Sequence, residues 1–227
     1  MVASPSAART HYHEEFNLPS FDDNIFLVWG YGSILWKQEF EYEAEYDTYI
    51  KGYKRVFYQG SKDHRGTPER PGRVVTLLPT EDDKEARVYG KAYQLPTDPA
   101  KLRSIFNALD TREQGGYERL LVTLYDAHPT TPGAEHELSL RERGVDTQGK
   151  GVVCLCYNGT AENKDYLGPD TTDAMARHIL GCTGPSGPNR EYLFFLADSL
   201  RAMKVDDPHV FELEAAARRL LAEEETN

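Results

Sequence analysis

A glutamate near the middle of the chain has the features of a proton-transfer group. Glu113 lies in the segment 110–117 (DTREQGGY), where a predicted helix ends, two glycines turn the chain and a predicted strand begins. Burial beside apolar strands raises the pKa of a carboxyl group, which suits a general base that works near neutral pH. Glu113 is therefore the candidate catalytic residue. The alternative is a solvated glutamate in a polar turn, which is the commoner situation for this residue type.

A glycine turn follows the first apolar run of the chain, residues 25–29. The turn reads Trp29-Gly30-Tyr31-Gly32-Ser33. Its glycines allow a tight bend and a close approach of the backbone to a ligand, and successive N–H groups there can bind an anion. The turn is not a dinucleotide fingerprint, because the third glycine is missing, and not a nucleophile elbow, because Ile34-Leu35 follows the serine. An ordinary turn at a strand end is the alternative.

Two further loops carry candidate binding groups. The segment 64–73 is basic and rich in Gly and Pro, and either Arg65 or Arg73 could hold a substrate carboxylate. The alternative is a hairpin connection with surface charges. The segment 184–189 (GPSGPN) is either the rim of a pocket or a link in which Asn189 caps the next helix.

The cysteines do not indicate metal or disulfide chemistry. Cys154, Cys156 and Cys182 are too few for a disulfide framework, and no second pair completes a zinc motif. They are interpreted as core residues. No metal site and no cofactor are predicted.

The elements that must position these groups follow from the hydrophobic pattern. Apolar and β-branched runs predict strands at 25–29, 48–59, 73–78, 87–95, 117–125 and 151–157. Helical spacing and capping signals predict helices at 99–110, at 173–180, from 189 and from 207. Strands first and helices mostly later predict an α+β fold with a small mixed β-barrel or sheet and flanking helices.

The same pattern predicts the domain organisation. Residues 1–24 are predicted to be a disordered or loosely attached arm, and 25–205 a single catalytic domain. Within that domain, 132–150 is predicted to be a surface insertion. Residues 206–227 are predicted to form a C-terminal helix with an acidic tail.

Composition excludes several classes of partner. The 227 residues carry a net charge of −11, which disfavours nucleic acid and anionic membranes. No apolar stretch approaches the roughly 18 residues of a membrane span, and no signal sequence is evident. We therefore expect a cytoplasmic protein with a small-molecule substrate, and a monomer is favoured. A small anionic substrate fits if the pocket is locally positive.

Six segments, in order along the chain, resemble a known family. The turn extended to 29–36 (WGYGSILW) is similar to the glycine-loop signature of the γ-glutamylcyclotransferases. The other five resemble the ChaC branch, which is specific for glutathione; they are 60–68 (GSKDHRGTP), 71–77 (PGRVVTL), 112–117 (REQGGY), 163–169 (NKDYLGP) and 184–189. The resemblance runs from about residue 26 to residue 203. Several ordered matches are far more specific than any one of them.

The resemblance implies a lyase that converts glutathione to 5-oxoproline and Cys-Gly without a cofactor. It implies that Glu113 is the catalytic acid and base. The substrate-binding residues that it and the loop chemistry suggest are Val28, Trp29, Gly30, Tyr31, Gly32, Ser33, Ile34, Arg65, Arg73, Tyr117 and Tyr166. The order Ile34-Leu35 and the long segment 132–150 depart from the family pattern, and the second bears on substrate range. Two alternatives stay open: turnover of other γ-glutamyl amines or dipeptides, and a binding module without catalysis.

Overall fold

A computed structural model describes residues 26–113, 116–128 and 153–226, so the predicted arm and insertion lie outside the described residues. The strands are β1 Phe26–Gly30, β2 Ala44–Lys51, β3 Tyr53–Ser61, β4 Gly72–Pro79, β5 Arg87–Leu95, β6 Glu118–Thr123, β7 Tyr125–Asp126, β8 Val153–Asn158, β9 Thr183–Gly184 and β10 Gly187–Pro188. The helices are the short 3-10 turn η1 Ser33–Leu35, α2 Pro99–Arg112, α3 Thr172–Leu180, α4 Asn189–Ala202 and α5 Pro208–Thr226. No helix in these described ranges is both long and apolar enough to cross a membrane.

The main sheet is mixed and curled. Its strand order is β6-β8-β1-β5-β2-β7, with β1 and β8 parallel and the other neighbours antiparallel. β6 and β7 belong to one run of chain that is interrupted only at Leu124, so a single segment supplies both edges of the sheet. The predicted α+β fold with a small mixed β-barrel or sheet and flanking helices is confirmed, and the sheet takes the form of a curled half-barrel.

β1 is central and is buried on both faces, which explains its continuous apolar sequence. Val28 lies on the face that packs against α2, in one cluster with Leu102 and Phe106. Leu27 and Trp29 lie on the opposite face, in the larger core. Asp98 caps α2 as predicted, since its side chain accepts the Lys101 N–H at 2.9 Å. The glycine turn therefore follows directly from a central, buried strand of the sheet.

The prediction of one strand over 48–59 is wrong. Gly52 has a φ of +76°, a conformation that glycine adopts without strain, and it divides the run into β2 and β3. β2 stays in the main sheet beside β5, whereas β3 leaves it and pairs with β4. The hairpin β3–β4 thereby becomes a separate layer.

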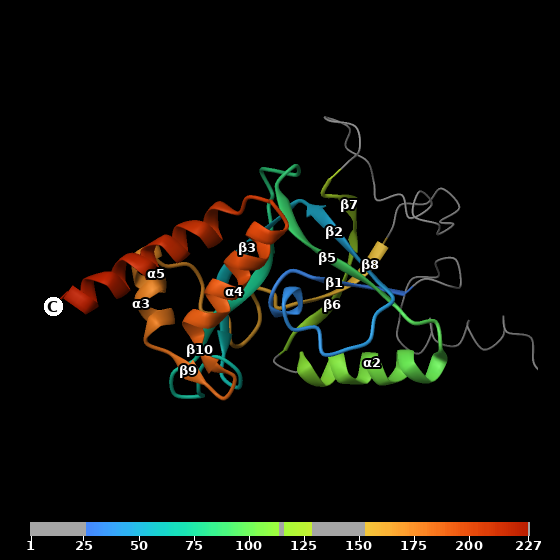
Figure 1. The fold of residues 1–227 in the computed structure, drawn as a ribbon, viewed down its shortest axis with the longest axis horizontal. Coiled ribbons are helices and arrows are strands. Elements are labelled where there is room, and N and C mark those ends of the chain that lie inside the picture. The colour runs from blue at the N-terminus through green and yellow to red at the C-terminus, as the bar shows by residue number, and fades with distance from the viewer. Residues whose placement is uncertain (1–25, 114–115, 129–152, 227) are drawn as a thin grey trace, which may run out of the picture.

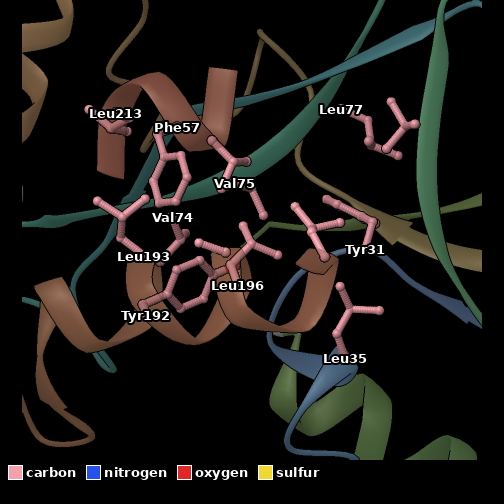
Figure 2. Packing of buried hydrophobic residues seen from close by; sticks show 14 of the residues in the cluster. Tyr31, Leu35, Phe57, Val74, Val75, Leu77, Tyr192, Leu193, Leu196 and Leu213 are labelled. Atoms are coloured by element: carbon pink, nitrogen blue, oxygen red, sulfur yellow. The ribbon is translucent and has the colours of Figure 1, made fainter. Parts of the chain in front are cut away.

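Three helices cover this hairpin. In Figure 1, α3, α4 and α5 lie with β3 in one half of the molecule, and the curled sheet with α2 forms the other half. Figure 2 shows the packing there, with Phe57 and Val74 of the hairpin beside Leu193 and Leu196 of α4 and Leu213 of α5. The core is thus continuous from the hairpin to the last helix.

The C-terminal helix α5 belongs to the same core as the rest of the chain. Val210, Leu213 and Ala217 are fully buried in the larger cluster. The Phe57 N–H, at a bulge in β3, donates to Nε2 of His209 at 3.1 Å. Burial lowers the pKa of His209, which keeps the imidazole neutral and able to accept. The predicted division at residue 205 therefore does not separate two cores.

Asn189 does not cap the following helix as one of the predictions held. Pro188 occupies the N-cap position of α4, and the Asn189 side chain turns inward. Its Oδ1 accepts the Arg73 N–H at 2.7 Å and its Nδ2 donates to the Arg73 carbonyl at 2.8 Å. The side chain is 0% exposed and acts as a bridge between α4 and β4.

We expect Asn189→Ala to lower the free energy of unfolding by about 2–4 kcal/mol, because it leaves one buried donor and one buried acceptor of Arg73 without partners. Urea denaturation monitored by circular dichroism measures this change. Asp198→Ala is a control on the exposed side of the same helix, where the stability change is expected to stay within about 0.5 kcal/mol. Equal effects of the two substitutions would contradict the assigned bridge.

Candidate active site

A cavity of about 410 Å³ lies between the end of β1, the end of α2 and the loop that joins β3 to β4. This volume falls in the range of small-molecule sites. The residues that line it are Trp29, Gly30, Tyr31, Gly32, Ser33, Ile34, Trp36, Lys37, Glu39, Gly60, Ser61, Lys62, Asp63, His64, Arg65, Val74, Val75, Arg112, Glu113, Tyr117, Tyr157, Lys164, Asp165, Ser186 and Tyr192. The glycine turn and Glu113, about eighty residues apart in sequence, thus share one cavity.

Glu113 is fixed at the C-terminal end of α2. It is the C-cap residue, and its N–H donates to the Leu109 carbonyl at 2.9 Å. The side chain is only 16% exposed. Burial raises the pKa of Glu113; the nearby Arg112 guanidinium opposes this shift and the carboxylate of Asp63 adds to it. The net direction is upward, as a general base near neutrality requires.

The glycine turn is packed so tightly that side chains are excluded at two positions. A Cβ at Gly30 would lie 2.6 Å from Cγ2 of Ile34, and a Cβ at Gly32 would lie 2.7 Å from Oη of Tyr192. The hydrogen bonds of η1 start at the Leu35 N–H, which donates to the Gly32 carbonyl, so the Ser33 N–H takes no part in them. The turn can therefore present backbone donors to the cavity.

Aromatic side chains form the inner wall. Tyr31 donates its hydroxyl hydrogen to Oδ1 of Asn158 at 3.0 Å, and its ring stacks on Trp29 at 5.7 Å. Burial raises the pKa of Tyr31, Tyr117 and Tyr192, so all three phenols stay neutral. Figure 2 shows Tyr31 and Tyr192 among the buried residues of the larger apolar cluster. A carboxylate beside these rings is therefore largely shielded from water.

Three of the predicted binding residues do not line the cavity. Val28 faces α2 on the other side of β1. Arg73 is buried, and its Nη1 donates to the carbonyls of Phe57 and Gly168, both at 2.9 Å. Tyr166 pairs with β3 at the opposite edge of the hairpin and packs against the ring of Tyr58. The predicted carboxylate clamp by Arg73 is therefore wrong for this cavity, since Arg73 does not line it and its Nη1 already donates to two carbonyl groups of the protein.

Arg65 lines the cavity, but one of its nitrogens is engaged by the protein. Its Nη1 donates to the Pro188 carbonyl at 3.0 Å and pairs with Glu191 at 3.1 Å. The 184–189 segment forms the short pair β9–β10 against this loop, and Ser186 lines the cavity. The segment therefore contributes one residue, Ser186, to the lining of the cavity.

Sequence reasoning missed several groups of the cavity, of which Arg112, Asp63 and Tyr192 act on Glu113 or on the turn. Arg112 and Asp63 both lie in segments that resemble the family, 112–117 and 60–68, whereas Tyr192 carried no such signal. Asp63 and Tyr192 come from a different loop and a different helix, and only the fold brings them close.

The cavity is less acidic than the whole chain. Lys and Arg contribute five of its charged residues (Lys37, Lys62, Arg65, Arg112, Lys164), and Asp and Glu contribute four (Glu39, Asp63, Glu113, Asp165). The chain as a whole has 26 basic against 37 acidic residues. A small anionic ligand therefore meets a more favourable potential inside the cavity than over the surface at large.

The three cysteines are free and buried, which confirms their interpretation as core residues. Among the residues that the structure describes, no group of three or more His, Cys, Asp or Glu side chains is arranged to hold a metal ion.

Comparison with known proteins shows that most of the chain is similar to members of one family. Residues 26–220 match the family model described as ChaC-like protein. A Danio rerio protein named glutathione-specific γ-glutamylcyclotransferase 1 is 39% identical over 193 residues, which cover 83% of this chain and 87% of that one. An Arabidopsis thaliana protein named γ-glutamylcyclotransferase 2-3 is 35% identical over 198 residues, covering 87% and 91%.

A solved structure shares the fold. The crystal structure of a selenomethionine-labelled γ-glutamylcyclotransferase specific to glutathione, from yeast, matches with a TM-score of 0.73 at 30% identity. The match covers 86% of this chain and 96% of that chain.

Proposed function

Because this chain belongs to the ChaC-like family, we propose that it is a lyase that cyclises the γ-glutamyl group of glutathione and releases 5-oxoproline and Cys-Gly. Relatives from several organisms are named as glutathione-specific γ-glutamylcyclotransferases. The observation in this chain that carries the proposal is a desolvated carboxyl group, Glu113, in one cavity with a turn that has no room for a side chain at Gly30 or Gly32.

The reaction needs no nucleophile from the protein. The α-amino nitrogen of the γ-glutamyl unit attacks the γ-carbonyl carbon of the same unit, a C–N bond forms, and a five-membered ring closes. The amide bond to the cysteinyl nitrogen then breaks. Holding the substrate in a near-attack conformation can supply on the order of 7–11 kcal/mol of the barrier reduction. A rigid cavity of the observed size is suited to this task.

One carboxyl group can move both protons. The attacking amine must lose a proton, which the Glu113 carboxylate accepts as a base. The departing cysteinyl nitrogen must gain a proton, which the Glu113 carboxylic acid then donates. The net reaction leaves Glu113 ionised again. Burial raises the pKa of Glu113, which makes its carboxylate a stronger base than an ordinary solvated glutamate.

The remaining cavity groups bind rather than react. Backbone N–H groups of the Tyr31–Ile34 turn are proposed to hold the substrate α-carboxylate or the developing oxyanion. Tyr117 is proposed to form part of the wall beside the γ-glutamyl chain. Arg65 is proposed to contribute positive charge at the rim. Ser33 is proposed to position neighbouring groups and not to attack.

An assay with two substrates tests the proposal. The purified full chain is incubated with glutathione and, separately, with γ-glutamyl-alanine, and 5-oxoproline is quantified by chromatography. We expect turnover of glutathione with release of Cys-Gly, and a much lower rate with γ-glutamyl-alanine. A preference for γ-glutamyl-alanine would indicate a cyclotransferase for other γ-glutamyl compounds, and no turnover of either would indicate a binding module.

The raised pKa of Glu113 predicts a pH dependence. Because the base must be ionised, kcat/KM for glutathione is expected to fall as the pH drops through the pKa of Glu113, and this acid limb should lie above 4.5, the ordinary value for glutamate. Asp63→Asn removes a negative charge that raises this pKa, so it should move the limb to lower pH. Initial rates over a pH series measure both. A limb that moves upward in Asp63→Asn would contradict the assignment.

We also propose the cytoplasm as the compartment, which the three free cysteines support. A monomer is the proposed assembly, and size-exclusion chromatography with light scattering tests it.

A further inference from the structure

We propose that Arg112 is a positioning residue that joins the Glu113 carboxylate to the glycine turn and holds the two at a fixed separation. The inference rests on the proposed function, because it takes Glu113 as the proton-transfer group and the turn as the binding element. In this role, Arg112 needs neither to contact the substrate nor to exchange protons.

The contacts of the guanidinium support this role. Its Nη2 donates to Oγ of Ser33 at 2.7 Å, and its Nη1 donates to the carbonyls of Lys37 at 2.8 Å and Gln38 at 3.3 Å. Its Nε lies 3.5 Å from Oε1 of Glu113. All three acceptors belong to the segment 33–38, which begins within the glycine turn. One planar group at the end of α2 therefore ties down that segment and the neighbouring carboxylate together.

The positive charge of the Arg112 guanidinium also lowers the pKa of Glu113. The Arg112 side chain is only 17% exposed, so solvent screens its charge weakly. The titratable groups that act on Glu113 or are acted on by it are Arg112, Asp63, Tyr31, Tyr117, Cys156 and Tyr192. The Glu39 carboxylate also faces the guanidinium, with Oε2 3.8 Å from Nη1 of Arg112. Within this set Arg112 supplies the charge that counteracts burial. An uncharged side chain that only held the segment 33–38 in place would not lower the pKa of Glu113.

The test compares pH profiles of kcat/KM for wild type, Arg112→Gln, Arg112→Lys and a charge-matched control, Arg103→Gln, on an exposed position of the same helix. In Arg112→Gln we expect the acid limb to move up by about one pH unit, because an adjacent opposite charge lowers a carboxyl pKa by that order. The activity loss is then roughly tenfold greater on the acid side than on the alkaline side. Arg103→Gln should follow wild type.

Arg112→Lys separates charge from geometry. Lysine keeps the positive charge, so the acid limb should stay near the wild-type position. A single ammonium lacks the planar fork that bonds Ser33, Lys37 and Gln38, so kcat/KM should still fall several-fold. An acid limb that does not move in Arg112→Gln, with or without a uniform loss of kcat/KM, would overturn the proposal.

A second measurement keeps the inference apart from the proposed reaction. Carbon-13 NMR of glutamate-labelled protein follows the titration of the Glu113 carboxyl group without turnover, and Glu113→Gln identifies its signal. If wild type fails to convert glutathione, the proposed function fails. The titration still decides whether Arg112 sets the ionisation of Glu113, and an equal Glu113 pKa in wild type and Arg112→Gln would overturn that role.

Discussion

Glu113→Gln is expected to lower the rate of 5-oxoproline release from glutathione by a factor on the order of 10²–10⁴, because general acid–base catalysis contributes that much and glutamine neither accepts nor donates the proton. The upper end is favoured, since the same carboxyl group is proposed to serve both the attack and the departure of the leaving group. Rates from chromatographic quantification of 5-oxoproline, with wild type in parallel, measure the loss. Full activity in a folded variant would rule out the mechanism.

The same substitution should leave the fold intact or strengthen it. The folded state raises the pKa of Glu113 above its unfolded value, so the group contributes most to stability below the unfolded pKa and loses that contribution as the pH rises through the folded pKa. Above the folded pKa the buried, ionised carboxylate therefore destabilises the folded state, and glutamine removes that charge. Thermal unfolding should give a Tm at least equal to that of wild type at neutral pH, and isothermal titration calorimetry should still detect glutathione binding.

Gly32→Ala is expected to lower kcat/KM by on the order of 10²-fold, because misplacing a binding element by about 1 Å can have that effect. The added Cβ would lie 2.7 Å from Oη of Tyr192 and 3.2 Å from Cγ2 of Val75, so the turn or the tyrosine must move. Steady-state kinetics with glutathione measure the loss, and circular dichroism checks that the variant folds.

A double-mutant cycle tests the stated cause. Tyr192→Phe deletes the oxygen that the new methyl group would meet, and the next atom of that ring, Cζ, is 3.9 Å away. Gly32→Ala should therefore reduce kcat/KM by a smaller factor in the Tyr192→Phe background than in wild type. Equal factors in the two backgrounds would show that the contact with Tyr192 does not explain the effect.

Much of the fold was predictable because local sequence patterns determine many of its strands and helices. The apolar run before Gly30, the Asp98-Pro99 helix start and the alternating strand 153–158 each appear in the structure close to the expected residues. The failure at 48–59 has a local cause as well, since Gly52 could have been recognised as a break. What the pattern could not reveal is that β3 leaves the main sheet, because strand partners far apart in sequence decide that.

The residues of the candidate site also fall into those that the sequence indicated and those that it did not. Glu113 and the glycine turn were candidates from their local sequence, and only the family resemblance favoured them over an ordinary turn and a solvated glutamate; the structure places both in one cavity. Arg73 was misassigned because its basic Gly/Pro-rich surroundings are equally typical of a substrate clamp and of a buried strut. The carbonyl groups that occupy it, from Phe57 and Gly168, belong to distant parts of the chain. Asp63 and Tyr192 were missed for the same reason.

The docking of α5 has a consequence for how the protein is made. The bulge amide of Phe57 depends on His209 for its acceptor, and buried Arg55 depends on Asp207 for its counter-ion, at 3.0 Å. Both partners leave the ribosome about 150 residues after the groups that need them. The hairpin β3–β4 therefore cannot bury its apolar face or exchange water for these two partners until α5 has been synthesised. A chaperone that shields this face during synthesis would act where the growing chain is most exposed to aggregation.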